Sequence, residues 1–82
     1  LMKINVGSNV CNFDLYGGTV EFRGTGANVI RDFGGTLRIA VPAGHVATVS
    51  SLTMTGGSVV MSDRVTLSNK PIIRGGIFLT VP

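Results

Sequence analysis

Four carboxylates are the only acidic side chains that this sequence offers for acid–base chemistry: Asp14, Glu21, Asp32 and Asp63. A glycosidase needs two carboxyl groups across one cleft, about 5 to 10 Å apart. Glu21 with Asp32 is the pair that we consider for a polysaccharide hydrolase or lyase. Each of the two has a structural alternative, because Glu21 stands between two apolar residues as an outward strand residue and Asp32 precedes a turn.

The other groups that could do chemistry stand alone. His45 follows a turn sequence and has Ser50 and Ser51 nearby, but no acid is placed to complete a triad. Cys11 is the single cysteine, which excludes an intramolecular disulfide, and we expect it to be a small buried side chain. We therefore predict that the chain is not an enzyme and has no catalytic residues, no cofactor and no metal.

The basic and aromatic residues bear on a nucleic-acid partner. Seven Lys and Arg residues give a net charge of +3, and their even spacing indicates a solvated surface. A second hypothesis is a small β-barrel that binds single-stranded nucleic acid, on which five aromatic residues would stack bases. No two of these aromatics stand at i and i+2 of one strand, so we rank this hypothesis lower. They are Phe13, Tyr16, Phe22, Phe33 and Phe78.

The segments that must position these side chains repeat one motif. Four Gly-Gly pairs recur at similar but unequal intervals, and the first three begin the segments GGTVEF, GGTLRI and GGSVVM. Polar and apolar residues that alternate with period two predict strands with one buried face. The glycines supply turn positions with positive φ. The turn glycines are Gly17, Gly18, Gly34, Gly35, Gly56, Gly57, Gly75 and Gly76, and the predicted interior is Val20, Phe22, Leu37, Ile39, Val59, Met61, Val65, Leu67, Leu79 and Val81.

The fourth segment, GGIFLTVP, departs from this template. Its apolar residues Ile77, Leu79 and Val81 lie one residue out of phase, which predicts that Phe78 points to the solvent face unless a bulge restores the register. A last strand without charge would be prone to aggregate if it stayed uncovered. We therefore predict that Ile77, Phe78, Leu79 and Val81 form an interface with another chain.

A repeat of about 20 residues with one strand–turn–strand unit in each period predicts a short β-solenoid or an interlocked trimeric β-helix. The alternative is a small β-barrel or sandwich. We expect residues 1–82 to form a single all-β domain, and Leu1 before Met2 suggests a fragment of a longer chain. No run of about 18 apolar residues is present, so we expect no membrane span, and the opening residues do not read as a signal peptide.

The Gly-Gly-Thr units, and above all SLTMTGGSVVMSD at residues 51–63, resemble the Gly-rich β-repeat modules of bacterial β-solenoid adhesins and of phage tail fibres and tailspikes. The resemblance covers about residues 17–81 and carries no catalytic or receptor-binding motif. It implies a structural virion or surface protein that acts by oligomeric assembly, such as a tail-fibre or tailspike segment or a head-decoration protein. The implied partners are copies of itself in a homotrimer, other virion or surface proteins, and a host-surface receptor or polysaccharide. The implied location is the virion or the extracellular surface.

Overall fold

The computed structural model describes residues 2–82 and leaves Leu1 outside the described residues. Two parallel sheets form. Sheet A has the strand order β1-β3-β5-β7-β10, and sheet B has the order β2-β4-β6-β8, with β9 on the far end of β6. The strands are β1 (Met2–Asn5), β2 (Asn12–Leu15), β3 (Thr19–Arg23), β4 (Asn28–Asp32), β5 (Thr36–Ala40), β6 (Ala47–Met54), β7 (Ser58–Ser62), β8 (Val65–Leu67), β9 (Ile72–Ile73) and β10 (Ile77–Val81).

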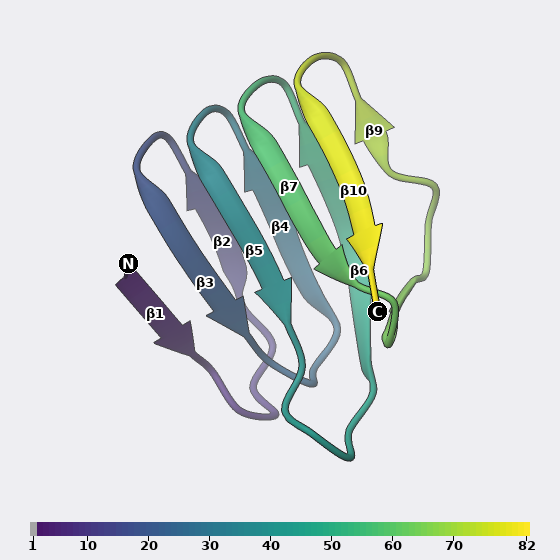
Figure 1. Cartoon of the computed structure of the whole chain (residues 1–82). Helices are drawn as coiled ribbons and strands as arrows, with labels where there is room; N and C mark the ends of the chain where they lie inside the picture. Colours follow the sequence, from purple (N-terminus) through teal and green to yellow (C-terminus); the bar gives the residue numbers. More distant parts are fainter. Residues whose placement is uncertain (1) are drawn as a thin grey trace.

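The chain alternates between the two sheets, and each strand pairs with the strand one coil later (Figure 1). This arrangement is a β-solenoid of about four turns, which confirms the predicted solenoid. The described residues form neither the barrel nor the sandwich of antiparallel hairpins that we considered as alternatives. Both sheets are built by one chain, so interlocking of three chains is not needed to close the described core.

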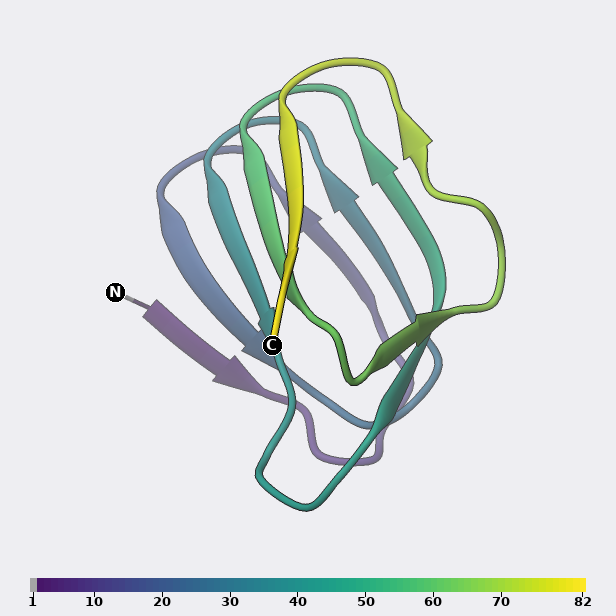
Figure 2. The same ribbon diagram turned by 45° about the vertical axis from the view of Figure 1, so that its right-hand side comes forward.

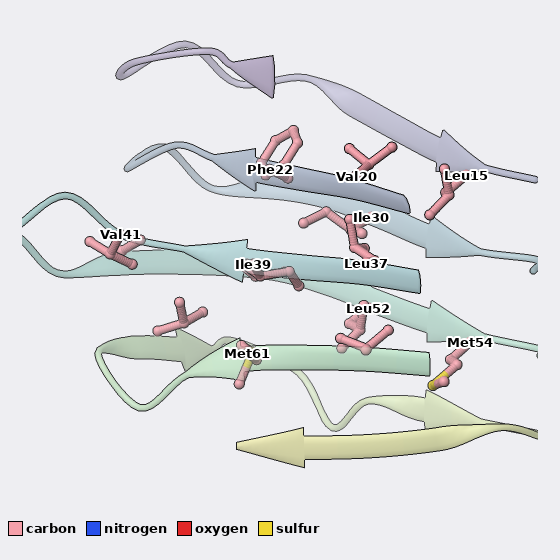
Figure 3. Close-up of a cluster of buried hydrophobic side chains, with 14 residues drawn as sticks. Leu15, Val20, Phe22, Ile30, Leu37, Ile39, Val41, Leu52, Met54 and Met61 are labelled. Atoms are coloured by element: carbon pink, nitrogen blue, oxygen red, sulfur yellow. The ribbon is translucent and has the colours of Figure 1, made fainter. Parts of the chain in front are cut away.

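Columns of apolar side chains fill the space between the two sheets (Figure 3). In sheet A, Leu37 stacks on Val20 and Ile39 stacks on Phe22, because the parallel register places equivalent residues of successive coils side by side. Full burial of each such side chain contributes about 1.5 to 3 kcal/mol. The buried apolar residues are Leu15, Val20, Phe22, Ile30, Leu37, Ile39, Val41, Ala47, Val49, Leu52, Met54, Val59, Met61 and Val65.

The last strand corrects one of our predictions. The register pairs Phe78 with Val59 and Leu79 with Val60, so Phe78 continues the inner column and packs on the core, although we expected it on the solvent face. The reason is the turn, since the second residue after every Gly-Gly pair points inward. Leu79 and Val81 therefore lie on the outer face and do not belong to the interior, where we had placed them.

Irregular connections between the strands accommodate the unequal lengths of the repeats. The longest interval has extra residues in the loop between β5 and β6, which projects beyond the stacked strands (Figure 2). The same interval contains a register shift between β4 and β6, which leaves Ser50 without a ladder partner. In the next coil, residues 68–71 separate β8 from β9, which pair with opposite ends of β6. Residues 2–82 contain no helix of the length and apolar character that a membrane crossing requires.

Candidate interaction surfaces

The Gly-Gly corners stack on one another where the chain passes from sheet B to sheet A. Backbone N–H groups of Thr36, Ser58 and Ile77 donate to the carbonyls of Gly18, Gly35 and Gly57, at 2.8, 3.0 and 3.1 Å respectively. A Cβ atom on Gly35 would lie 2.6 Å from the Gly18 carbonyl oxygen, which leaves no space for a side chain. The paired glycines thus let adjacent corners approach to the spacing of parallel strands.

Two aromatic rings stack on the outside of these corners. Tyr16 and Phe33 each precede a Gly-Gly pair, and their ring centroids lie 5.0 Å apart with nearly parallel planes. Tyr16 is 73% exposed. The Arg31 guanidinium lies 5.3 Å from the Phe33 ring centroid and donates two hydrogen bonds to Asp14, at 2.7 and 2.8 Å. The hydrogen bond from Arg31 lowers the pKa of the Asp14 carboxyl.

Our sequence analysis did not pair these two rings. They stand one full repeat apart along the chain, so no local spacing joins them. The signal that could have found them is their identical position before successive Gly-Gly pairs, because equivalent positions of neighbouring coils become neighbours in a solenoid. The other aromatic pair, Phe13 with Phe22, has centroids 5.1 Å apart and packs at the core.

The outer face of sheet A is more apolar at its last strand than at its first strands. Ile77 continues a column whose earlier members are Thr19, Thr36 and Ser58, all polar. Ile77 is 62% exposed and Leu79 is 54% exposed. The strand that carries them pairs only with β7 among the described strands, so one backbone edge of β10 is free. We call Ile77, Leu79 and Val81, together with this edge, the β10 face.

The structure separates the two carboxylates that we considered for hydrolysis. Glu21 lies on the outer side of sheet A, where its carboxylate is 3.1 Å from Arg23 Nε and 3.8 Å from Arg38 Nε. Asp32 lies inside, paired with Leu15 and Met54 on neighbouring strands of sheet B. The cavity beside Glu21 is not lined by Asp32, so the two carboxyl groups do not face each other across one cleft.

The remaining candidates lie apart from one another. His45 is in the projecting loop, where its backbone N–H donates to the Pro42 carbonyl, whereas Ser50 and Ser51 are in β6. Cys11 is half-buried against the core with a free thiol. Within residues 2–82, no three His, Cys, Asp or Glu side chains gather where they could hold a metal ion.

Comparison of this chain with protein-family models, with curated proteins and with solved structures finds no match in any of the three.

Proposed function

We propose that this chain is a structural module of a virion or cell surface that acts by assembly, such as a segment of a phage tail fibre or tailspike or a head-decoration protein. The observation that carries the proposal is the β10 face. A parallel strand with a free edge is a template for pairing with another chain. Ile77 and Leu79 add apolar surface beside that edge, and Ile77 does so in a column where the preceding strands present polar side chains.

A second copy of the chain is the partner that fits this face. Strand β1 also pairs with only one described neighbour, so the opposite end of sheet A has a free edge of the same parallel kind. Met2 is exposed there, on the inner column that ends in Phe78 at the other end. Backbone pairing of the β10 edge of one copy with the β1 edge of the next is a head-to-tail contact, which forms a ring where the rotation between copies closes, and we expect a homotrimer or a larger closed ring.

The nucleic-acid hypothesis has less support than assembly, because it was argued for a small barrel and the described strands form a solenoid. Phe13 and Phe22 pack at the core, and Tyr16 and Phe33 stack on each other. We do not propose it as the function.

Replacement of Leu79 by Asp tests the proposal. Leu79 points outward, so a charge there should cost the fold little but should oppose burial at an interface. We expect Leu79→Asp to lower the mass measured by light scattering to that of one chain, while the far-ultraviolet circular dichroism remains that of the folded protein. Ile77→Asp is a second variant in the same outer row.

Val46→Asp is the matched control, because Val46 is an exposed apolar residue of the projecting loop, 73% exposed against 54% for Leu79. It should leave the mass unchanged. An assembly that persists in both Leu79→Asp and Ile77→Asp would refute the role of the β10 face.

A further inference from the structure

A second feature of sheet A lies at the carboxyl ends of its strands, on the outer side. A cavity of about 140 Å³ opens there, and three arginines from different coils line it: Arg23, Arg38 and Arg64. Glu21 lines the same cavity. Three guanidinium groups against one side-chain carboxylate leave an excess of positive charge at a site that has room for one small group.

Glu21 accepts a hydrogen bond from Arg23 and lies within ion-pair distance of Arg38. The Glu21 side chain is 8% exposed although it points away from the core. Arg23 and Arg38 both approach its carboxylate through Nε. Their terminal nitrogens make no hydrogen bond to the described residues, so they remain free to donate. Guanidinium groups that present two parallel N–H donors bind carboxylate, sulfate and phosphate groups in a bidentate way.

Arg64 has a different part in the same site. Its guanidinium donates to the carbonyls of Val41, Pro42 and His45, at 2.8, 2.9 and 3.1 Å. These bonds use its terminal nitrogens and tie the projecting loop to the turn between β7 and β8. Arg64 therefore contributes a fixed positive charge to the cavity, whereas Arg23 and Arg38 supply the free donors.

The rest of the lining favours a ligand that carries hydroxyl groups beside its anion. Glu21 Oε1 lies 3.8 Å from Arg38, too far for a hydrogen bond, so this oxygen can accept one from a ligand hydroxyl. The Ser62 hydroxyl oxygen already accepts from the backbone N–H of Arg64, at 3.2 Å, and its own O–H can donate. Val60 and Val81 add an apolar wall. We propose that this cavity binds an anionic sugar, with the oxyanion on Arg23 and Arg38 and a hydroxyl on Glu21.

A nucleic-acid strand fits the cavity less well. Binding of single strands combines phosphate contacts with stacking of bases on aromatic side chains. None of the residues that line the cavity is aromatic. The exposed rings, Tyr16 and Phe33, lie at the Gly-Gly corners, which precede the opposite ends of the same strands.

Titration of the ¹⁵N-labelled protein with sodium glucuronate, followed by backbone amide and arginine Nε–H resonances, tests the proposal. We expect saturable shifts at residues 21–23, 38–40 and 60–64, with a dissociation constant in the millimolar range that is typical of a few charged contacts, about 1 to 10 mM. Inorganic sulfate should bind more weakly, and neutral glucose should produce no saturable shift. Glucose 6-sulfate and glucose 6-phosphate show which oxyanion is preferred.

Variants separate the roles of the residues. Arg23→Gln and Arg38→Gln should each weaken glucuronate binding about tenfold, the loss of one charge-assisted contact. The Arg38 side chain is 63% exposed, so its truncation leaves the core intact. Arg74→Gln is the matched control, because it removes the same charge from an exposed position beside the last Gly-Gly corner. Glu21→Gln should keep sulfate binding but abolish the preference for glucuronate over sulfate.

Four results would overturn the proposal: no saturable shift with any anionic sugar, equal shifts with neutral glucose, sulfate binding as tight as glucuronate in the wild-type protein, or equal loss of binding in Arg74→Gln and Arg38→Gln. Tighter binding of a thymidine oligonucleotide at the same resonances would also contradict it and would favour a nucleic-acid partner. The titration reads individual resonances and can be repeated on the Ile77→Asp variant, because neither Ile77 nor its ladder partner Ser58 lines the cavity. Its failure is therefore distinguishable from failure of the assembly proposal.

Discussion

Asp32 is a carboxylate in the interior of the solenoid, and its environment is unfavourable for a charge. It is 1% exposed and stands in the ladder between Leu15 and Met54. One oxygen, Oδ1, accepts a hydrogen bond from the Gly34 N–H at 3.0 Å, which holds the corner. The other, Oδ2, has no hydrogen-bond partner among the described residues. Burial raises the pKa of Asp32, and the bond from Gly34 opposes this only in part.

This raised pKa predicts how stability depends on pH. The folded state holds the Asp32 proton more tightly than the unfolded state, so the protonated group stabilises the fold below the unfolded-state pKa, and this stabilisation is lost as pH rises through the folded-state pKa. Asp32→Asn cannot ionise and keeps an oxygen for the Gly34 N–H. We expect its free energy of unfolding, measured in urea, to increase relative to wild type between pH 4 and pH 7.

Asp63→Asn is the control for this experiment, since Asp63 is exposed in the turn between β7 and β8. The gain of Asp32→Asn over wild type should rise with pH more steeply than that of Asp63→Asn. A difference between Asp32→Asn and wild type that does not change with pH would contradict the account of Asp32 as a destabilised buried carboxylate.

For individual residues, the sequence predicted whether a side chain faces inward or outward but not which other side chains surround it. Alternation predicted correctly that Glu21 faces outward, but nothing local could show that Arg38, one repeat further along the chain, would lie within ion-pair distance of it. We interpreted the arginines as an evenly spread, solvated set. Three of them nevertheless line one cavity, because Arg23 and Arg38 lie on neighbouring strands of sheet A and Arg64 lies in the turn that follows β7.

The Gly-Gly corner is the element that sets the register of each coil. The second glycine of every pair has positive φ, from 75° at Gly57 to 88° at Gly76. The corners differ in the space around them. A Cβ added at Gly17 or Gly18 would have no heavy atom within 4 Å, whereas one added at Gly57 would contact the backbone of Gly34 and Gly35. The need for a positive φ and the lack of room for a Cβ atom are therefore two separate constraints at these positions.

Alanine substitutions at three of these glycines should therefore have graded effects. Gly17→Ala meets neither constraint and should change the free energy of unfolding by less than about 0.5 kcal/mol. Gly18→Ala meets the conformational constraint alone and should cost about 1 to 2 kcal/mol. Gly57→Ala meets both and should cost more than about 3 kcal/mol. Urea unfolding monitored by circular dichroism measures all three, and equal costs for Gly18→Ala and Gly57→Ala would contradict the stacking of the corners.

The last strand shows how the corner overrides apolar periodicity. Ile77, Leu79 and Val81 alternate as an inward set would, and on that pattern we placed Leu79 and Val81 in the interior. The corner instead directs Phe78 inward, as it directs Val20, Leu37 and Val59 in the earlier coils. Alignment of the four segments at their glycines predicts the observed register, whereas alternation within one segment does not.

For the whole molecule, the repeat of Gly-Gly pairs predicted the solenoid because each pair begins a strand in the same sheet. The repeat did not predict how the coils would accommodate the unequal intervals between the pairs. The register shift at Ser50 and the separation of β8 from β9 depend on how these strands pair with neighbouring coils. The local sequence does not encode that pairing. Both lie in sheet B, so sheet A keeps a regular ladder that ends in the β10 face.

The central claim is that this solenoid works by assembly, and the mass of the wild-type chain in solution tests it most directly. Light scattering behind a sizing column, over a range of protein concentrations, gives that mass without reference to a standard. We predict about three times the 8.5 kDa of one chain, or the mass of a larger closed ring. A mass of one chain at every concentration would contradict the claim.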